Sequence, residues 1–312
     1  MADDWHNIAL RFGLYVGLAA LFGISLFGFY GQRLSASFLS FGRRFTSVLL
    51  VLAAVDIVFS ACAILVTAKA MSGAETYSEL TTHIVGMVIT GTEMGVAWLV
   101  RMGVLLAFLI LASASIQRRP QFGLLSVLSA ISLATLAWSG HAVMHDGVAR
   151  LSHLASDITH LWAAGAWIGA LFCLIMLASM NPASSPDAVE VLSQTSSGFA
   201  TVGTIIVVLL VITGTVNYLF IAGPTIRTLI DTQYGLLLVV KLILFVGMLL
   251  LAAANRYLFS PKVELAIKAG NGAKASQLLR ISLLTETSLA LVVIACVAWL
   301  GVLSPIVATQ AR

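Results

Sequence analysis

The stretch HAVMHDGVARLSHLASDITHLWAAGAW (His141–Trp167) joins two long apolar segments of the chain. The preceding apolar run covers Phe122–Val143, and the following one covers Ala155–Leu177. Each is long enough for a membrane-spanning helix, which needs about 20 apolar residues. The junction is polar and holds four of the six histidines of the chain. It therefore predicts a turn at the membrane surface, with metal-capable side chains gathered at it.

The composition shows that lipid is the solvent for most of the chain. Of the 312 residues, 60% are hydrophobic and only 10% are charged, whereas soluble domains have about 25% charged residues. The formal net charge of +4 does not indicate a nucleic-acid partner, because the basic residues lie in short loops and form no tract interleaved with aromatics. We expect the lipid bilayer as partner, and no nucleic acid.

Eight apolar runs can cross the bilayer, and we expect each to be helical because backbone groups in lipid must be satisfied within the segment. The fold class predicted is all-α: a polytopic membrane protein in which residues 1–312 form a single domain, a bundle of eight transmembrane helices. The expected spans are Ile8–Tyr30, Thr46–Ala68, Glu93–Ser115, Phe122–Val143, Ala155–Leu177, Phe199–Ile221, Tyr234–Leu258 and Ile281–Leu303.

The distribution of Lys and Arg between the loops predicts the orientation. Ten basic residues fall on one side of the predicted bundle: Arg33, Arg43, Arg44, Arg118, Arg119, Arg256, Lys262, Lys268, Lys274 and Arg280. Five lie on the other side or near the termini: Lys69, Arg150, Arg227, Arg11 and Arg312. The richer side should be cytoplasmic, so both termini are expected to be periplasmic.

The histidines of the junction have helical spacing. His153 and Asp157 are about 40° apart around a helix, and His160 is about 20° from His153. On a helix that begins early enough, HxxxDxxH therefore puts two imidazoles and a carboxylate on one face. His141 and His145 are likewise one turn apart.

Imidazole and thioether ligands suit copper, so we expect a copper site, for Cu(I) or Cu(II), at the outer face. His141, His145, His153 and His160 are its candidate ligands, and Met144 is a thioether near His141. Asp157 is either a ligand or an acceptor that orients a histidine ring. His83, in the second loop, is a weaker candidate. The alternative is that these are interfacial polar residues that close helix ends, and Trp162 and Trp167 are most simply interface aromatics.

Four ionisable residues lie inside the expected spans: Asp56, Arg101, Lys241 and Glu286. Each costs about 2.5–3.5 kcal/mol at the centre of the bilayer on insertion scales, so we expect them to face the interior of the bundle. Asp56 and Arg101 are the preferred pair, and Asn217 is a plausible neighbour of Lys241. These residues are either structural pairs or a polar route leading inward from the histidines.

Several segments resemble the CopD family of bacterial copper resistance and homeostasis membrane proteins. HLASDITHLWAAGAWIGAL (His153–Leu171) is similar to the histidine, aspartate and Trp-x-Gly pattern of that family. The segments TGTVN (Thr213–Asn217), YGLLLVVKLIL (Tyr234–Leu244), AAANR (Ala252–Arg256) and RISLLTE (Arg280–Glu286) are similar to the part that its members share most widely, about residues 193–303.

The resemblance implies an inner-membrane protein that moves copper from the periplasm toward the cytoplasm, with a periplasmic copper carrier protein as partner. No enzymatic activity is expected, because the sequence lacks both HExxH and the ATP-binding pattern GxxxxGK[ST]. One alternative is a b-type haem electron-transfer protein that uses histidines of adjacent helices, such as His141 and His160. A metal-dependent hydrolase is the least favoured alternative.

Overall fold

The computed structural model describes residues 2–116, 118–140, 145–180, 187–223, 232–259, 261–262, 265 and 272–303. Within these ranges every regular element is a helix, and eight helices are long and apolar enough to cross a membrane. The predicted all-α bundle with eight spans is therefore confirmed. The helices that form these spans are α1 (Ala2–Leu34), α2 (Gly42–Ser72), α4 (Glu93–Ser115), α5 (Phe122–Ala134), α6 (Gly147–Ala178), α7 (Asp187–Ala222), α9 (Gln233–Ala254) and α11 (Gly272–Leu300). The fourth span reaches its full length only with the 3₁₀ segment that continues α5 to Ser139.

Shorter elements connect these spans. They are the 3₁₀ helices η1 (Ala36–Phe41), η2 (Tyr77–Glu79) and η3 (Thr135–Ser139), the short helix α3 (Thr82–Gly91), and the π-helical segment η5 (Asn255–Phe259) that continues α9. Helix α3 lies in the connection between the second and third spans, and it packs against α2 and α4.

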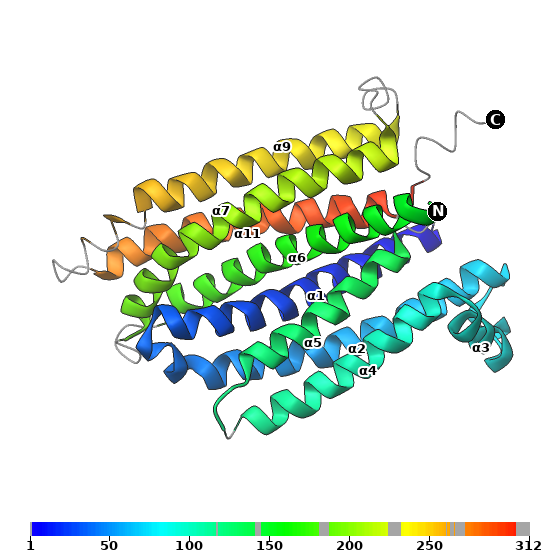
Figure 1. Cartoon of the computed structure of the whole chain (residues 1–312), viewed down its shortest axis with the longest axis horizontal. Coiled ribbons are helices and arrows are strands. Elements are labelled where there is room, and N and C mark those ends of the chain that lie inside the picture. The colour runs from blue at the N-terminus through cyan, green and yellow to red at the C-terminus, as the bar shows by residue number, and fades with distance from the viewer. Residues whose placement is uncertain are drawn as a thin grey trace.

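Helices α1 and α6 form the centre of the bundle, and Figure 1 shows the other spans on both sides of them. They cross closely because three glycines meet at the crossing. A Cβ atom at Gly23 would collide with the backbone of α6 at Gly165 and Gly169. Gly165 and Gly169 form the GxxxG spacing by which small residues let membrane helices approach. This contact sets the rotation of α6 and so the direction of its polar side chains.

The remaining spans form two flanks. Helices α2, α4 and α5 lie on one side of the central pair, and α7, α9 and α11 lie on the other (Figure 1). Helix α9 is outermost and has many exposed apolar side chains, as a lipid-facing helix should. Because the number of spans is even, α1 begins and α11 ends at the same face of the bundle. We call this face the terminal face, and the other the opposite face.

The boundaries at the polar junction differ from those expected. The fourth span ends as a helix at Ala134 and continues as η3 only to Ser139. Helix α6 begins at Gly147, eight residues before the predicted start at Ala155. His153 therefore lies in a helix, whereas the predicted spans placed it in the connecting loop. His160 lies about four turns inside the same helix.

Two contacts explain the early start of α6. Arg150, in its first turn, forms an ion pair with Glu93 at the start of α4. Leu154 is buried against Ala137 and the neighbouring Trp138 at the end of the fourth span. These tertiary contacts hold a segment that hydropathy alone places outside the membrane.

Candidate metal site

Three side chains on one face of α6 contact three side chains of α7. His153 stacks on Phe220, Asp157 accepts a hydrogen bond from Asn217, and His160 contacts Thr213. The two helices are antiparallel, so residue numbers rise along α6 and fall along α7 with increasing distance from the terminal face. This arrangement confirms that HxxxDxxH presents its three polar side chains on one helix face, which is turned toward α7.

The environment of His160 determines which ring nitrogen carries the proton. Its Nδ1 lies 2.9 Å from Oγ1 of Thr213, and that hydroxyl lies 2.5 Å from the carbonyl oxygen of Leu209. A threonine hydroxyl has a single proton, and the carbonyl of Leu209 can only accept it. Nδ1 of His160 must therefore donate to Thr213, which leaves the lone pair on Nε2. The ring also packs beside Gly214, where a Cβ would be in ordinary van der Waals contact with it at 3.6 Å.

His145 and His153 come together closer to the terminal face. Their ring centroids are 5.2 Å apart, and Phe220 stacks on the His153 ring at 4.8 Å with an interplanar angle of 9°. Metal–imidazole bonds are about 2.0–2.1 Å long, so two imidazoles on one ion have centroids within roughly 6.5 Å of each other. The spacing of His145 and His153 is compatible with one shared ion.

His153 and His160 are too far apart to share that ion. They are seven positions apart on α6, which is about 10.5 Å along the helix axis. Among the residues that the structure describes, no group of three His, Cys, Asp or Glu side chains is close enough to hold a metal. The structure thus divides the predicted ligands into a shallow level, His145 and His153, and a deeper level, Asp157 and His160.

His141 and Met144 lie outside the described residues. The residue before His141 is nevertheless placed beside the deeper level, because a Cβ on Gly140 would be 3.4 Å from Oδ2 of Asp157. His83 is not brought to either level. It is exposed on α3, which packs against α2 and α4 at the edge of the bundle (Figure 1).

One charged side chain from another span lies near the deeper level. Lys241, on α9, is within electrostatic range of both Asp157 and His160. Its positive charge compensates that of the Asp157 carboxylate. Asn217, which the sequence suggested as a neighbour of Lys241, donates to Asp157 at 3.4 Å.

Arg11 of α1 donates to the carbonyl oxygens of Gly301 and Ser139, and so connects two chain segments that end at the terminal face.

Asp56 and Arg101 lie in the other flank of the bundle. Each lies within electrostatic range of the other, and they are only 0% and 5% exposed, but no direct ion pair joins them among the described residues. The preferred pairing therefore stays a prediction. Neither carboxyl oxygen of Asp56 has a hydrogen-bond partner among the described residues. Gly17 on α1 makes room for this carboxyl group, because a Cβ there would collide with it.

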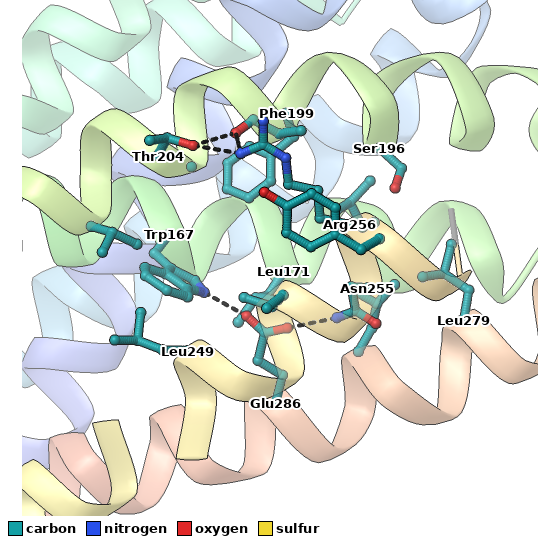
Figure 2. Close-up of a pocket in the computed structure, with 18 residues that line it drawn as sticks. Trp167, Leu171, Ser196, Phe199, Thr204, Leu249, Asn255, Arg256, Leu279 and Glu286 are labelled. Atoms are coloured by element: carbon teal, nitrogen blue, oxygen red, sulfur yellow. Dashed lines mark hydrogen bonds between the residues drawn. The ribbon is translucent and has the colours of Figure 1, made fainter. Parts of the chain in front are cut away.

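Glu286 has two partners that sequence reasoning missed. Nε1 of Trp167 donates to Oε1 of Glu286 at 2.7 Å, and Nδ2 of Asn255 donates to Oε2 at 2.8 Å (Figure 2). Trp167 is only 3% exposed, so its interpretation as an interface aromatic is wrong: it is a buried hydrogen-bond donor in the bundle. Trp162, by contrast, is 38% exposed.

Phe220 and Thr213 were also absent from the predicted site. Together with Asn217 they have helical spacing in the sequence and lie on one face of α7. Polar or aromatic residues at that spacing in an apolar span are a usable signal. The sequence did not show which helix these residues face. Only the register of α6 against α7 in the structure identifies α6 as that helix.

These features define the class of the protein: a polytopic helical membrane protein with buried or half-buried histidines and a carboxylate between two neighbouring spans. Two family models match the chain, described as "Copper resistance protein D-like, N-terminal domain" over residues 1–151 and "Copper resistance protein D" over residues 193–300. Together they cover more than half of its length. The chain belongs to the copper resistance protein D family.

Two relatives support this assignment. The chain is 41% identical over 305 residues to "Copper resistance protein D" of Pseudomonas syringae pv. tomato, covering 97% of this chain and 98% of the relative. It is 29% identical over 267 residues to "Inner membrane protein YebZ" of Escherichia coli strain K12, covering 85% and 87%. No solved structure matches the chain.

The family relationship and the eight apolar helices make the chain a multi-pass inner-membrane protein of the copper-resistance class. The descriptions of its relatives name copper resistance and no catalysed reaction. The family relationship gives no support to the b-type haem alternative.

Proposed function

We propose that the protein binds copper at the terminal face and moves it through the α6–α7 interface toward the opposite face. The shallow level, His145 and His153, takes part in capture together with His141 and Met144. The deeper level, His160 with Asp157, receives the ion next. The observation that carries this proposal is the His160–Thr213 contact, because it leaves the lone pair of Nε2 available to a metal.

The donor types support copper as the ion. Imidazole nitrogen and thioether sulfur together suit Cu(I), and imidazole with carboxylate suits Cu(II). The histidine ring that binds a metal is usually held by a hydrogen bond from its other nitrogen, and Thr213 provides one for His160. Asp157 adds a negative charge beside the ion, and Lys241 compensates that charge when the ion is absent.

The direction of movement follows from the proposed orientation. Arg33, Arg43, Arg44, Arg118, Arg119 and Arg256 lie at the opposite face or in the loops that join its helix ends. By the positive-inside rule this face is cytoplasmic, so the terminal face is periplasmic and copper moves inward. A periplasmic copper carrier protein is the proposed donor to the shallow level.

The first test is copper binding by the purified protein in lipid nanodiscs, titrated against a Cu(I) chelator of known affinity. We expect His145→Ala/His153→Ala to reduce the bound copper or weaken its affinity at least tenfold, and His160→Ala to remove the deeper ion. His83→Ala is the matched control, because His83 is exposed and remote from both levels. Wild-type stoichiometry and affinity in both site variants would overturn the proposal.

The second test is copper flux into proteoliposomes at equal protein incorporation. A permease loses flux in His160→Ala and keeps it in His83→Ala. A protein that binds copper normally but gives no flux above empty liposomes in the wild type would be a binding or sensing protein, and the proposed movement of copper would be wrong.

A further inference from the structure

A second polar layer lies deeper in the bundle, about 10.5 Å along α6 from His160. Its centre is the carboxyl group of Glu286 on α11, which is only 2% exposed. Trp167 of α6 donates to one of its oxygens and Asn255 of η5 donates to the other. Figure 2 shows Glu286 between these two donors. Glu286 lines a cavity of about 190 Å³.

This layer has unused acceptor capacity. A carboxylate offers about four lone-pair positions, and two donors occupy only two of them. With Glu286 ionised, the Asn255 amide must turn its NH₂ group to the carboxylate, because only that group can donate. Its carbonyl oxygen Oδ1 therefore points away from Glu286. This oxygen has no hydrogen-bond partner among the described residues, although Asn255 is only 9% exposed. Asn255 also lines the cavity.

The charges around the cavity leave Glu286 without a salt-bridge partner in the described part of the chain. Besides Glu286, the charged or titratable residues lining the cavity are Arg256 and Tyr257, both on η5; the lining residues of α6, α7 and α9 carry no titratable group. Arg256 is turned to α7, where its NH1 group donates to the carbonyl oxygen of Ala200 and to Oγ1 of Thr204 (Figure 2). A buried carboxylate without a cation is costly inside a membrane protein.

We propose that the Glu286–Asn255 pair is a binding site for a small, hard monovalent cation, a proton or Na⁺, in the cavity between α6, α7, α9 and α11. The cation occupies the free lone pairs of the Glu286 carboxylate and is within the reach of Oδ1 of Asn255. Trp167 and Asn255 hold the carboxylate in place through their N–H groups.

The donor set distinguishes this site from the copper levels above it. Carboxylate and amide oxygens suit hard cations, whereas copper prefers imidazole and thioether ligands. The Glu286 carboxylate carries one negative charge, and Arg256 at the rim of the cavity is turned away from it to α7. A monovalent cation therefore neutralises the carboxylate, whereas a divalent ion would leave an excess positive charge beside it.

The site can be tested without copper, using the full-length protein in nanodiscs. One arm compares the melting temperature in NaCl with that in choline chloride at equal ionic strength. If Na⁺ is the ligand, we expect a rise of about 2–4 °C at saturation, and no rise in Glu286→Gln. The other arm records infrared difference spectra between about pH 5 and pH 9 and follows the carbonyl stretch of a protonated carboxyl group. If a proton is the ligand, this band is present in the wild type, titrates, and is missing in Glu286→Gln.

Matched variants keep both arms interpretable. Glu190→Gln is the control, because Glu190 is an exposed carboxylate on α7. Asn255→Leu removes Oδ1 and should weaken the Na⁺ effect or shift the titrating band while Glu286 is still present. Wild-type protein that shows no difference between Na⁺ and choline, and no carboxyl band dependent on Glu286, would overturn the proposal.

Discussion

Replacing Thr213 by valine is expected to weaken copper binding at the deeper level by about 10- to 100-fold. Valine keeps the shape of threonine but has a methyl group where Oγ1 accepts from Nδ1 of His160 at 2.9 Å. The ring then has two options. It can keep the Nδ1 proton without an acceptor, which costs about 1–3 kcal/mol for a buried donor. It can otherwise move the proton to Nε2, where copper must displace it.

Either option opposes metal binding, and the expected loss of affinity corresponds to about 1.4–2.8 kcal/mol. The assay is the competitive Cu(I) titration in nanodiscs. Thr213→Ser should restore most of the affinity, because serine retains the hydroxyl group. Thr215→Val is the matched control: its hydroxyl is exposed and bonds only within α7, to the carbonyl oxygen of Val211.

Wild-type affinity in Thr213→Val, with the same stoichiometry, would refute the reasoning. It would mean that copper does not bind His160 through Nε2. A loss in Thr213→Val that Thr213→Ser does not restore would instead indicate that the helix interface had repacked. The melting temperature of the copper-free variants separates this outcome from a loss confined to copper binding.

Three further predictions concern the bundle. Gly169→Ala should lower the free energy of unfolding by about 1–3 kcal/mol, because the added methyl group overpacks the α1–α6 crossing. Gly103→Ala should have little effect, because there is open space around Gly103. Thermal melting in nanodiscs checks both variants. Trp167→Phe removes a donor to Glu286 and should cost about 1–3 kcal/mol, measured in the same assay; an unchanged melting temperature would contradict this role. Alkaline phosphatase, a reporter that is active only in the periplasm, should be active when fused after Arg312. A reporter that is active only in the cytoplasm should be inactive at the same position. The reverse result would invert the proposed direction of copper movement.

The polar junction shows how far sequence reasoning reached and where it stopped. The helical spacing of His153, Asp157 and His160 predicted a common face, and the structure has that face. The same reasoning placed the start of the helix too late, because hydropathy treats Arg150 and His153 as surface residues. The pairing of Arg150 with Glu93 is a contact between residues far apart in the sequence, which no local window can register.

Glu286 and Trp167 show a second limit. The sequence indicated that Glu286 must face the interior, because a charge in lipid is costly. It did not indicate its partners, which lie 119 and 31 residues away. Trp167 was assigned to the membrane interface by its residue type, but its depth in the bundle makes it a buried donor.

The sequence by itself determined the number of spans, the all-helical class, the polar junction and the copper-type donors in it. These properties depend on the transfer of about 20 residues at a time into lipid and on the geometry of a single helix, so they need no knowledge of neighbours. The tertiary structure decided which side chains meet: His153 with Phe220, His160 with Thr213, and Glu286 with Asn255. The physical reason is that lipid offers little preference between apolar helix faces, so rotation and register are set by close packing of small residues. The contact of Gly23 with Gly165 and Gly169 is such a packing, and it exists only once α1 and α6 have come together.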